Sequence, residues 1–318
     1  MTVPIIDLTP WRDGSDRAGV ADAIGRACRD VGFLVIAGHG VPDATIAAAR
    51  AASLAFFRLP AAVKARYAPD SSVYRGYAPL YGEALSASLD NPTPPDLKES
   101  YNMGPVDPPP ATLPAADAAH FFAPNIWPDE VPSLGPALQA YYRAMSELAG
   151  ELMRMFAVAL ALPADWFDDK ISQHITNLSA LYYPAPSQSP LPGQLRAGAH
   201  TDYGSLTILQ RDTAPGGLEV LLDGDWYKVP DVPGAFVVNL GDLMADWTGG
   251  AWRSTMHRVG LPPLDVPSER LSIAFFHQPN AEARIDRLPT PLAGPRPAPG
   301  VTSGVHVTEK IQKTKIAA

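Results

Sequence analysis

The segment LEVLLDGDWYKV, residues 218–229, decides the fold because it predicts a β-hairpin. Two short strands, at 218–222 and 226–229, flank the pair Asp223-Gly224. Asp-Gly is typical of the two-residue turns that join antiparallel strands, since these turns need positive φ angles that few other residues adopt. The segment therefore indicates an antiparallel sheet in the second half of the chain.

Short strands continue on both sides of this hairpin. They are predicted at 175–183, 206–211, 235–240, 257–261 and 271–276, with a turn at Gly216-Gly217. Many short strands at regular spacing favour an all-β sandwich or a jelly-roll barrel.

The rest of the chain carries mostly helical and irregular patterns. Helices are predicted at 17–30, 43–57 and about 134–162, with shorter ones opening at Pro60 and near Val307, and strands at 4–7, 33–37 and 98–103. Residues 70–97 and the proline-rich 104–132 are predicted to be irregular. We therefore predict a mainly β fold with flanking helices. A helix-rich region at 1–170, a core at 171–285 and a C-terminal extension at 286–318 would form one structural unit.

The composition limits the possible functions. Of the 318 residues 46% are hydrophobic, which is enough for a sizeable core. The formal net charge of −8 disfavours a nucleic-acid partner, because phosphate contacts need clustered Lys and Arg. No run reaches the ~18 apolar residues that span a bilayer, and the N-terminus does not resemble a signal peptide. We therefore expect a cytoplasmic protein with no membrane partner, and a monomer is compatible with the sequence.

The single cysteine, Cys28, excludes an intrachain disulfide and indicates a reducing compartment. It lies at helical spacing with Val20 and Ile24. That position favours a small buried hydrophobe over a reactive thiol.

The residues with the most chemical content are His200-Thr201-Asp202 and the later His257. Side chains two apart on a strand point to the same side, so His200 and Asp202 are predicted to face a barrel interior together. His257 follows 55 positions after Asp202, far enough to return on another strand. Two histidines and a carboxylate form the facial triad that binds redox-active iron and leaves positions open for oxygen and a co-substrate. Any one of the seven histidines taken alone is more commonly a surface or core residue, so the prediction depends on the combination.

Arg270 and Ser272 are also two apart on one predicted strand. An arginine directed into a barrel is costly unless it meets an anion. Guanidinium donors match the oxygens of a carboxylate. The pair therefore predicts a clamp for an organic acid beside the metal, with an internal salt bridge or a surface arginine as the alternative.

Together these motifs resemble the iron(II)/2-oxoglutarate-dependent dioxygenases of the isopenicillin N synthase-like family. The matching segments are NLSALYYP at 177–184, AHTDYGSLT at 199–207, GLEV at 217–220, DGDW at 223–226, VVNLGD at 237–242, STMHRV at 254–259 and RLS at 270–272. In the N-terminal third they are PIIDL at 4–8, ACRDVGF at 27–33 and GHGV at 38–41. The resemblance covers nearly the whole chain.

The resemblance implies a double-stranded β-helix (jelly-roll) core with N-terminal helices packed around it. It also implies Fe(II) and 2-oxoglutarate, which chelates the iron and places its distal carboxylate on the clamp. The implied metal ligands are His200, Asp202 and His257, and the implied co-substrate-binding residues are Arg270, Ser272 and Tyr183. One departure from the family is Leu181, at a position that is often asparagine.

The implied enzyme is an oxidoreductase. With O2 as the other co-substrate, it would oxidise a C–H bond of a small organic substrate by hydroxylation, desaturation or cyclisation, and release succinate and CO2. One alternative is an Fe(II) oxidase of the same fold that does not use 2-oxoglutarate, since a substrate carboxylate can occupy the clamp. The other is a non-catalytic barrel that binds a small ligand, which an intact triad and clamp disfavour.

The prime substrate is not specified by the sequence. Candidates for lining its cavity are Arg75, Tyr77, Tyr101, Phe275 and His277, although each residue is more commonly a packing or surface residue. Arg75 would indicate an anionic group on the substrate or an acidic partner within the chain. Prolines in 104–132 and after 286 predict covers over the barrel mouth.

Two further motifs are predicted to be structural. His39, in Gly-His-Gly, follows a buried strand and is not expected to bind metal. Asn239, Gly241 and Asp242 are expected to shape a turn in the barrel.

Overall fold

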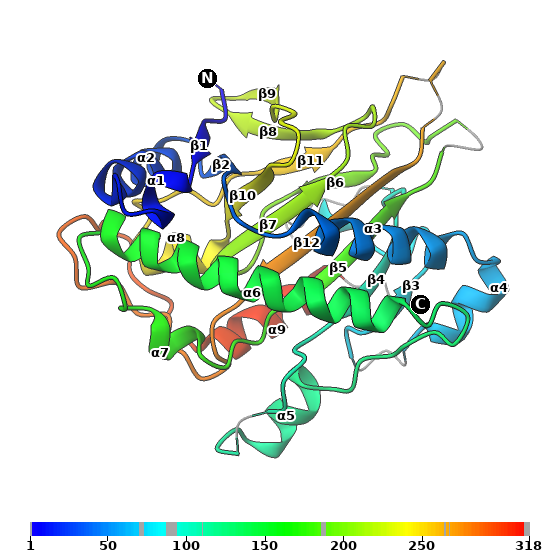
Figure 1. Ribbon diagram of the computed structural model, residues 1–318, viewed down its shortest axis with the longest axis horizontal. Helices are drawn as coiled ribbons and strands as arrows, with labels where there is room; N and C mark the ends of the chain where they lie inside the picture. Colours follow the sequence, from blue (N-terminus) through cyan, green and yellow to red (C-terminus); the bar gives the residue numbers. More distant parts are fainter. Residues whose placement is uncertain are drawn as a thin grey trace.

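The computed structural model describes residues 2–69, 73–86, 94–109, 111–185, 189–263, 265–266 and 268–314. Two sheets form its centre (Figure 1). The larger sheet contains, in spatial order, β1 (Ile5–Asp7), β2 (Phe33–Ala37), β10 (Phe236–Leu240), β7 (Leu206–Arg211), β12 (Arg270–His277), β5 (Asn177–Tyr183), β4 (Glu99–Met103) and β3 (Gly76–Ala78). The smaller sheet contains β6 (Ala197–His200), β11 (His257–Val259), β8 (Leu218–Leu222) and β9 (Asp225–Lys228). Its pairings are all antiparallel, and in the larger sheet only β1 and β2 run parallel.

The two sheets share one cavity. The smaller sheet contributes Leu218 and His257 to its lining, and the larger sheet contributes Thr207 and Ser272. The mainly β fold with a two-sheet core is therefore confirmed, and the cavity between the sheets is where a site can form.

Helices lie around the two sheets (Figure 1). They are α1 (Thr9–Arg12), α2 (Arg17–Asp30), α3 (Asp43–Phe57), α4 (Ala61–Lys64), α5 (Ala115–Phe121), α6 (Leu134–Ala159), α7 (Asp168–Ile171), α8 (Asp242–Trp247) and α9 (Ser303–Thr314), with a 3-10 turn at Ala65–Tyr67. The long α6 lies against β7 and β12, and α3 lies against β5 and β12.

The sequence of α6 explains why it covers this sheet. Leu138, Tyr141, Met145 and Leu152 recur every three, four or seven positions, and all four are buried. Residues at this spacing form one side of a helix. They share a hydrophobic core with Ile273 of β12, and burying each such side chain contributes roughly 1.5–3 kcal/mol. The stripe is therefore a packing surface.

The predicted hairpin is formed by β8 and β9, with Leu222 opposite Asp225. Asp223 and Gly224 have φ angles of 51° and 94°. Positive φ at both central positions is what a two-residue turn between antiparallel strands requires.

Predicted and observed bounds agree where the sequence pattern is strong. The bounds of α2, α3, β2, β7 and β8 are those predicted. The elements not predicted are α1, β3, α5, α7, β6 and α8, and none of them exceeds seven residues. Elements this short do not develop a periodic pattern. Because β3 and α5 lie in the segments predicted to be irregular, that prediction is wrong at these two places.

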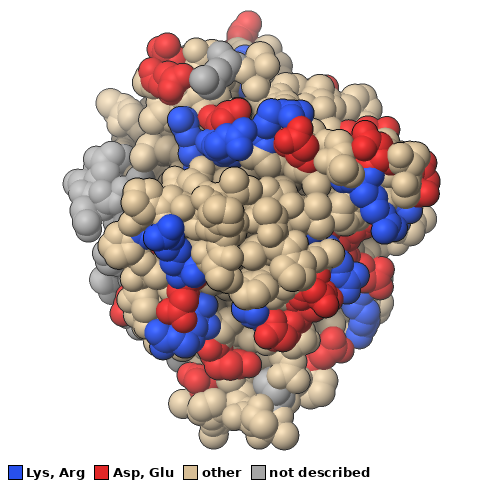
Figure 2. Space-filling model, turned by 90° about the vertical axis from the view of Figure 1, so that its left-hand side faces the viewer, with Lys and Arg blue, Asp and Glu red and all other residues tan. Residues whose placement is uncertain are grey.

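Charges of both signs are interleaved on the face shown in Figure 2, around a largely uncharged centre. This face of the described chain carries no continuous basic patch, which nucleic-acid binding would need. Among the described helices, none is by itself long and apolar enough to cross a membrane. The bent pair Asp43–Phe57 and Ala61–Tyr67 meets that test by length and composition only.

Cys28 is fully buried on α2. Burial raises the pKa of its thiol. The prediction that Cys28 is a packing residue is confirmed.

Candidate active site

The structure brings His200, Asp202 and His257 together inside the cavity. Asp202 Oδ1 lies 3.7 Å from His200 Nε2 and 3.7 Å from His257 Nε2. The two imidazole rings are 4.3 Å apart between their centroids. All three side chains are buried, and their ligand atoms lie within 4.8 Å of one another. Three donors this close on one side of a point are the arrangement of a facial triad.

Both histidines are oriented by backbone carbonyls two residues earlier in the chain. His200 Nδ1 lies 2.7 Å from Gly198 O, and His257 Nδ1 lies 3.1 Å from Thr255 O. A carbonyl oxygen can only accept, so each Nδ1 carries the proton and each Nε2 keeps its lone pair. This is the tautomer that a metal-binding imidazole needs.

The carboxylate of Asp202 is oriented in the same way. Its Oδ2 accepts hydrogen bonds from Thr207 Oγ1 at 2.5 Å and from Asn239 Nδ2 at 2.7 Å. These two partners occupy the oxygen that faces away from the histidines. The other oxygen, Oδ1, faces both Nε2 atoms and is available to a cation.

Asp202 does not lie on a strand, so the strand argument for its orientation is wrong. His200 is the last residue of β6, and residues 201–203 have no strand pairing. The Asp202 carbonyl instead accepts from the backbone N–H of Asp242, at the start of α8. The chain therefore turns toward α8 after His200, and it is the hydrogen bonds to Oδ2 that direct the carboxylate to the histidines.

The pKa values fit a site ready for a cation. Burial, followed by the neighbouring His257, lowers the pKa of His200 to about 3. Burial alone would raise the pKa of Asp202, but the two histidines and the hydrogen bonds from Asn239 and Thr207 hold it below its ordinary value. At neutral pH the site therefore contains a neutral His200 and an ionised Asp202, the forms in which these side chains bind metals.

Arg270 and Ser272 lie on one face of β12, as predicted. Every second residue of this strand lines the cavity, namely Arg270, Ser272, Ala274 and Phe276. The residues between them pack in the core beneath α6. Ser272 is opposite Leu181 on β5, and Arg270 is opposite Tyr183.

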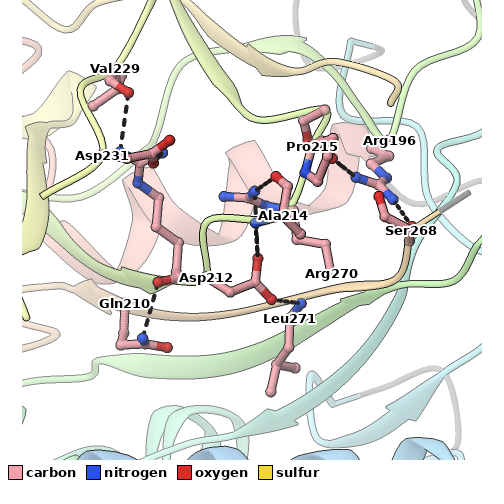
Figure 3. A network of polar contacts seen from close by, with 12 residues as sticks. Arg196, Gln210, Asp212, Ala214, Pro215, Val229, Asp231, Ser268, Arg270 and Leu271 are labelled. Atoms are coloured by element: carbon pink, nitrogen blue, oxygen red, sulfur yellow. Dashed lines mark hydrogen bonds and ion pairs between the residues drawn. The ribbon is translucent and has the colours of Figure 1, made fainter. Parts of the chain in front are cut away.

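Arg270 lines the cavity and lies in a network of polar contacts (Figure 3). Its Nη1 donates to Ala214 O at 2.7 Å and lies 3.5 Å from Asp212 Oδ1. Arg196 donates to the next carbonyl, Pro215 O, at 2.6 Å. Both guanidinium groups therefore hold the same loop, and this loop fixes Arg270 in place.

One donor of Arg270 has no partner. The side chain is 2% exposed, and its Nε is buried without a hydrogen bond among the described residues. A buried charged donor without a partner is costly. A carboxylate oxygen would satisfy it, so the guanidinium fits an organic acid in the cavity better than a purely internal salt bridge.

Tyr183 and Leu181 line the cavity on β5, on the same face of the strand. Tyr183 is buried, and burial raises the pKa of its hydroxyl. Leu181 gives this wall an apolar side chain where the family often has an asparagine amide.

Of the five residues predicted to line the cavity, only Arg75 does so. Tyr77 donates to Glu99, Tyr101 donates to Ile126 O, and Phe275 packs against Tyr142 on the side of α6. His277 contacts Ser205 Oγ at 2.7 Å. The predictions for these four residues are wrong, and Phe276 is the member of the Phe275-Phe276 pair that lines the cavity.

Arg75 does not meet an acidic side chain among the described residues. Its guanidinium donates to the carbonyls of Tyr74 at 2.8 Å, Phe121 at 2.6 Å and Ala123 at 3.2 Å. Two of these carbonyls lie at the end of α5, and α5 contributes His120 and Phe121 to the cavity. The proline-rich segment therefore does cover the cavity, and Arg75 fastens it there. At the C-terminus the covering residues are Val307 and Ile311 of α9, not the proline-rich stretch before it.

Two site residues lie outside those predicted. Asn239 is a residue of β10 and not part of a turn, so its predicted role is wrong, and Thr207 was not singled out. The sequence does contain a signal for Asn239, because its amide lies within the apolar run FVVNL at residues 236–240. A polar side chain in a buried strand needs a partner. The structural role predicted for His39 agrees with its contacts to Gly234 O, at 2.7 Å, and to the ring of Phe236.

Comparison with known protein families agrees with this geometry. Residues 3–130 match the family described as non-haem dioxygenase in morphine synthesis, N-terminal. Residues 175–279 match the 2OG-Fe(II) oxygenase superfamily. The second match contains the triad and the clamp.

Individual proteins are similar over nearly the whole chain. Validamycin A dioxygenase from Streptomyces hygroscopicus subsp. limoneus is 36% identical over 315 residues, covering 97% of this chain and 86% of that protein. A solved structure of a Neurospora crassa protein in complex with alpha-KG and thymine has a TM-score of 0.84 at 28% identity, covering 98% of this chain and 96% of that one. A putative 2OG-Fe(II) oxygenase family protein from Caulobacter crescentus also has a TM-score of 0.84, with 28% identity and 98% of each chain covered.

The similarity fixes the cofactors and the reaction class. The protein is an oxidoreductase that uses Fe(II), 2-oxoglutarate and O2 and acts on small organic substrates. With its two-sheet core, its buried His-Asp-His cluster and a relative 36% identical along 97% of its length, the chain belongs to the Fe(II)/2-oxoglutarate-dependent dioxygenases of the isopenicillin N synthase-like family.

Proposed function

We propose that His200, Asp202 and His257 hold the catalytic Fe(II). The observation that carries this proposal is that the two carboxylate oxygens of Asp202 have different partners. Thr207 and Asn239 bind its Oδ2, while Oδ1 lies 3.7 Å from both Nε2 atoms. Both Nδ1 atoms are committed to carbonyls, so Oδ1 and the two Nε2 atoms remain available to one cation.

We further propose that Arg270 and Ser272 bind the distal carboxylate of 2-oxoglutarate, with Tyr183 beside it. The unpartnered Nε of Arg270 supports this role, because a guanidinium offers two parallel donors to a carboxylate. Ser272 lies on the same face of β12. Asp212 and the carbonyl of Ala214 hold the guanidinium in position before the acid binds.

When bound, iron with 2-oxoglutarate and O2 supplies the oxidation of an unactivated C–H bond, with release of succinate and CO2. The side chains of this chain do the positioning. His200, Asp202 and His257 would hold the metal from one side and leave its other side to the reactants. Phe276, Phe121 and Ile311 contribute apolar surface to the cavity and keep bulk water from it.

The substrate is proposed to be a small organic molecule that enters between α5 and α9, where Phe121, Val307 and Ile311 line the cavity. Hydroxylation, desaturation and cyclisation all fit such a site.

On the single cysteine alone, we also propose a reducing compartment such as the cytoplasm.

Anaerobic titration tests the assignment of the ligands. Adding Fe(II) and 2-oxoglutarate to the metal-free protein should produce a visible metal-to-ligand charge-transfer band, and His200→Ala or Asp202→Ala should abolish it. His174→Phe is a matched control, because it removes a partly buried histidine outside the triad and should leave the band in place. A normal band in both triad variants would falsify the assignment.

Product analysis tests the role of 2-oxoglutarate. One succinate formed for each substrate oxidised is expected. Substrate oxidation with O2 consumption but without succinate would instead favour an oxidase of the same fold.

A further inference from the structure

The smaller sheet is irregular next to His200. On β6 and β11, His200 is opposite His257 and Ala197 is opposite Val259. Between these two pairs β6 advances by three residues and β11 by only two, so the register of the strands shifts. Such a β-bulge leaves the extra residue without ladder partners, so the sheet by itself does not fix the backbone at Gly198.

Side chains bind both backbone groups of Gly198. Its N–H donates to Asp96 Oδ1 at 2.8 Å, and its carbonyl accepts from His200 Nδ1 at 2.7 Å. We propose that Asp96 is a positioning residue for the iron ligand His200 and acts through Gly198. This inference rests on the proposed function, in which His200 binds the metal.

Asp96 is itself rigidly held. It is 2% exposed, and its Oδ2 accepts from Lys98 Nζ at 3.0 Å and from the backbone N–H of Leu85 at 3.2 Å. Lys98 also pairs with Glu83 at 3.1 Å. The carboxylate therefore has an ion pair on one oxygen, and its other oxygen is directed to Gly198.

The residue at 198 must be small for Asp96 to approach. A Cβ at this position would lie 3.3 Å from Asp96 Oδ1 and 3.2 Å from Ser86 Oγ. Alanine would therefore push against the carboxylate. Glycine permits the approach, but its backbone is the least restricted of any residue, so the hydrogen bond to Asp96 supplies a restraint that the sequence otherwise lacks.

The consequence is a fixed direction for the His200 lone pair. The imidazole is held through Nδ1 by the Gly198 carbonyl, and that carbonyl moves if the residue rotates. Partners that orient a ligand in this way typically change metal affinity about 10- to 100-fold when removed. We therefore expect Asp96→Asn to lower the affinity for Fe(II) about tenfold or more, because an amide in place of the carboxylate also loses the pairing with Lys98.

A matched control is Glu99, which follows Lys98 and is the first residue of β4. It forms a buried ion pair with Lys64. Glu99→Gln likewise removes the charge of a buried carboxylate bonded to a lysine, but this carboxylate contacts Lys64 and Tyr77 instead of Gly198. Both variants should lower the melting temperature, and only Asp96→Asn should weaken Fe(II) binding.

The experiment has two readouts. Fe(II) affinity is measured by anaerobic titration of the charge-transfer band at saturating 2-oxoglutarate. Exchange of the Gly198 amide hydrogen is measured in the metal-free protein, where Asp96→Asn should make it faster. If Asp96→Asn does not fold, Asp96→Ala removes the carboxylate while Lys98 keeps its ion pair with Glu83, and it should show the same two effects.

The outcomes separate this inference from the proposed function. A wild-type protein without a charge-transfer band would overturn the proposed iron site, and this inference with it. The iron site stands if the wild-type protein shows the band and His200→Ala abolishes it. The role of Asp96 is then overturned if Asp96→Asn and Glu99→Gln have equal Fe(II) affinity and equal exchange of the Gly198 amide hydrogen.

Discussion

Thr207 Oγ1 donates a hydrogen bond of 2.5 Å to Asp202 Oδ2, which places a strand residue of the larger sheet behind the carboxylate of the triad. Because Thr207 lies on β7 and Asp202 on the segment after β6, this contact joins the two sheets at the proposed metal site.

The first prediction concerns this contact. Thr207→Val keeps the shape of the side chain and removes the donor, so Asp202 is left with Asn239 as its side-chain partner. We expect Fe(II) affinity to fall about tenfold, measured by anaerobic titration. Thr248→Val is the control, since Thr248 is also buried but donates to backbone carbonyls within α8. Equal affinities in the two variants would contradict the role of Thr207.

The second prediction concerns Arg270. Lysine preserves the charge but cannot offer two parallel donors, so Arg270→Lys should raise the dissociation constant of 2-oxoglutarate. Losing one hydrogen bond to a charged group costs about 1.5–3 kcal/mol, which corresponds to roughly 10- to 150-fold. The dissociation constant is read from the charge-transfer band at saturating Fe(II).

An exposed arginine provides the control for this second prediction. Arg154 makes a two-point contact with Asp168, at 3.2 Å and 2.9 Å, on the surface. Arg154→Lys should therefore leave 2-oxoglutarate binding unchanged. The proposed role of Arg270 in binding 2-oxoglutarate is disproved if Arg270→Lys binds this acid as tightly as Arg154→Lys does.

Local sequence patterns were sufficient for the regular elements. The bounds of α2 and β7 could be predicted because apolar spacing and nearby turn residues are both local signals. The clustering of the three proposed metal ligands and the shared strand face of Arg270 and Ser272 could be predicted, because each motif joins reactive residue types at a spacing typical of the family.

The remaining features depend on which surfaces meet in three dimensions. The sequence cannot tell which of Phe275 and Phe276 faces inward, because both are apolar and the answer depends on α6 lying against one face of β12. Arg75 contacts carbonyls from residues 74, 121 and 123, and the distant pair can be recognised only after the chain has folded. The same is true of Asp96, which reaches Gly198 across 102 positions.

The third prediction concerns acid stability. Burial lowers the pKa of His174 to about 4 and places the pKa of His277 well below its ordinary value of 6.5. A histidine whose pKa is lower in the folded state contributes stability above its unfolded value, and this contribution is lost as the pH falls toward the folded value. The free energy of unfolding of the metal-free protein should therefore decline between about pH 6.5 and pH 4.

His174→Phe tests this linkage. Phenylalanine keeps an aromatic ring beside Tyr142 and Phe275, which His174 contacts, and has no proton to gain. Urea unfolding at about pH 7.5 and about pH 5, on either side of the ordinary histidine pKa, should show a smaller loss of stability in the variant than in the wild type. An equal loss in both proteins would mean that His174 does not titrate as its burial implies.

The last prediction concerns α9 as part of the cavity wall. His306 Nε2 contacts Tyr203 O at 3.0 Å, and Lys310 Nζ contacts Asp242 Oδ2 at 2.8 Å, so the helix is attached to the segment that carries Asp202 and to α8. Val307 lines the cavity and is 5% exposed, whereas Val305 on the same helix is 45% exposed. Val307→Asp places a carboxylate against an apolar wall, which costs more than the ~1.4 kcal/mol that corresponds to a tenfold change. Amide exchange across residues 303–311 should therefore become at least about tenfold faster in Val307→Asp, while Val305→Asp keeps the wild-type rate. Identical exchange in both variants would show that α9 is not held by its cavity-facing side, and that the cavity does not depend on this helix for closure.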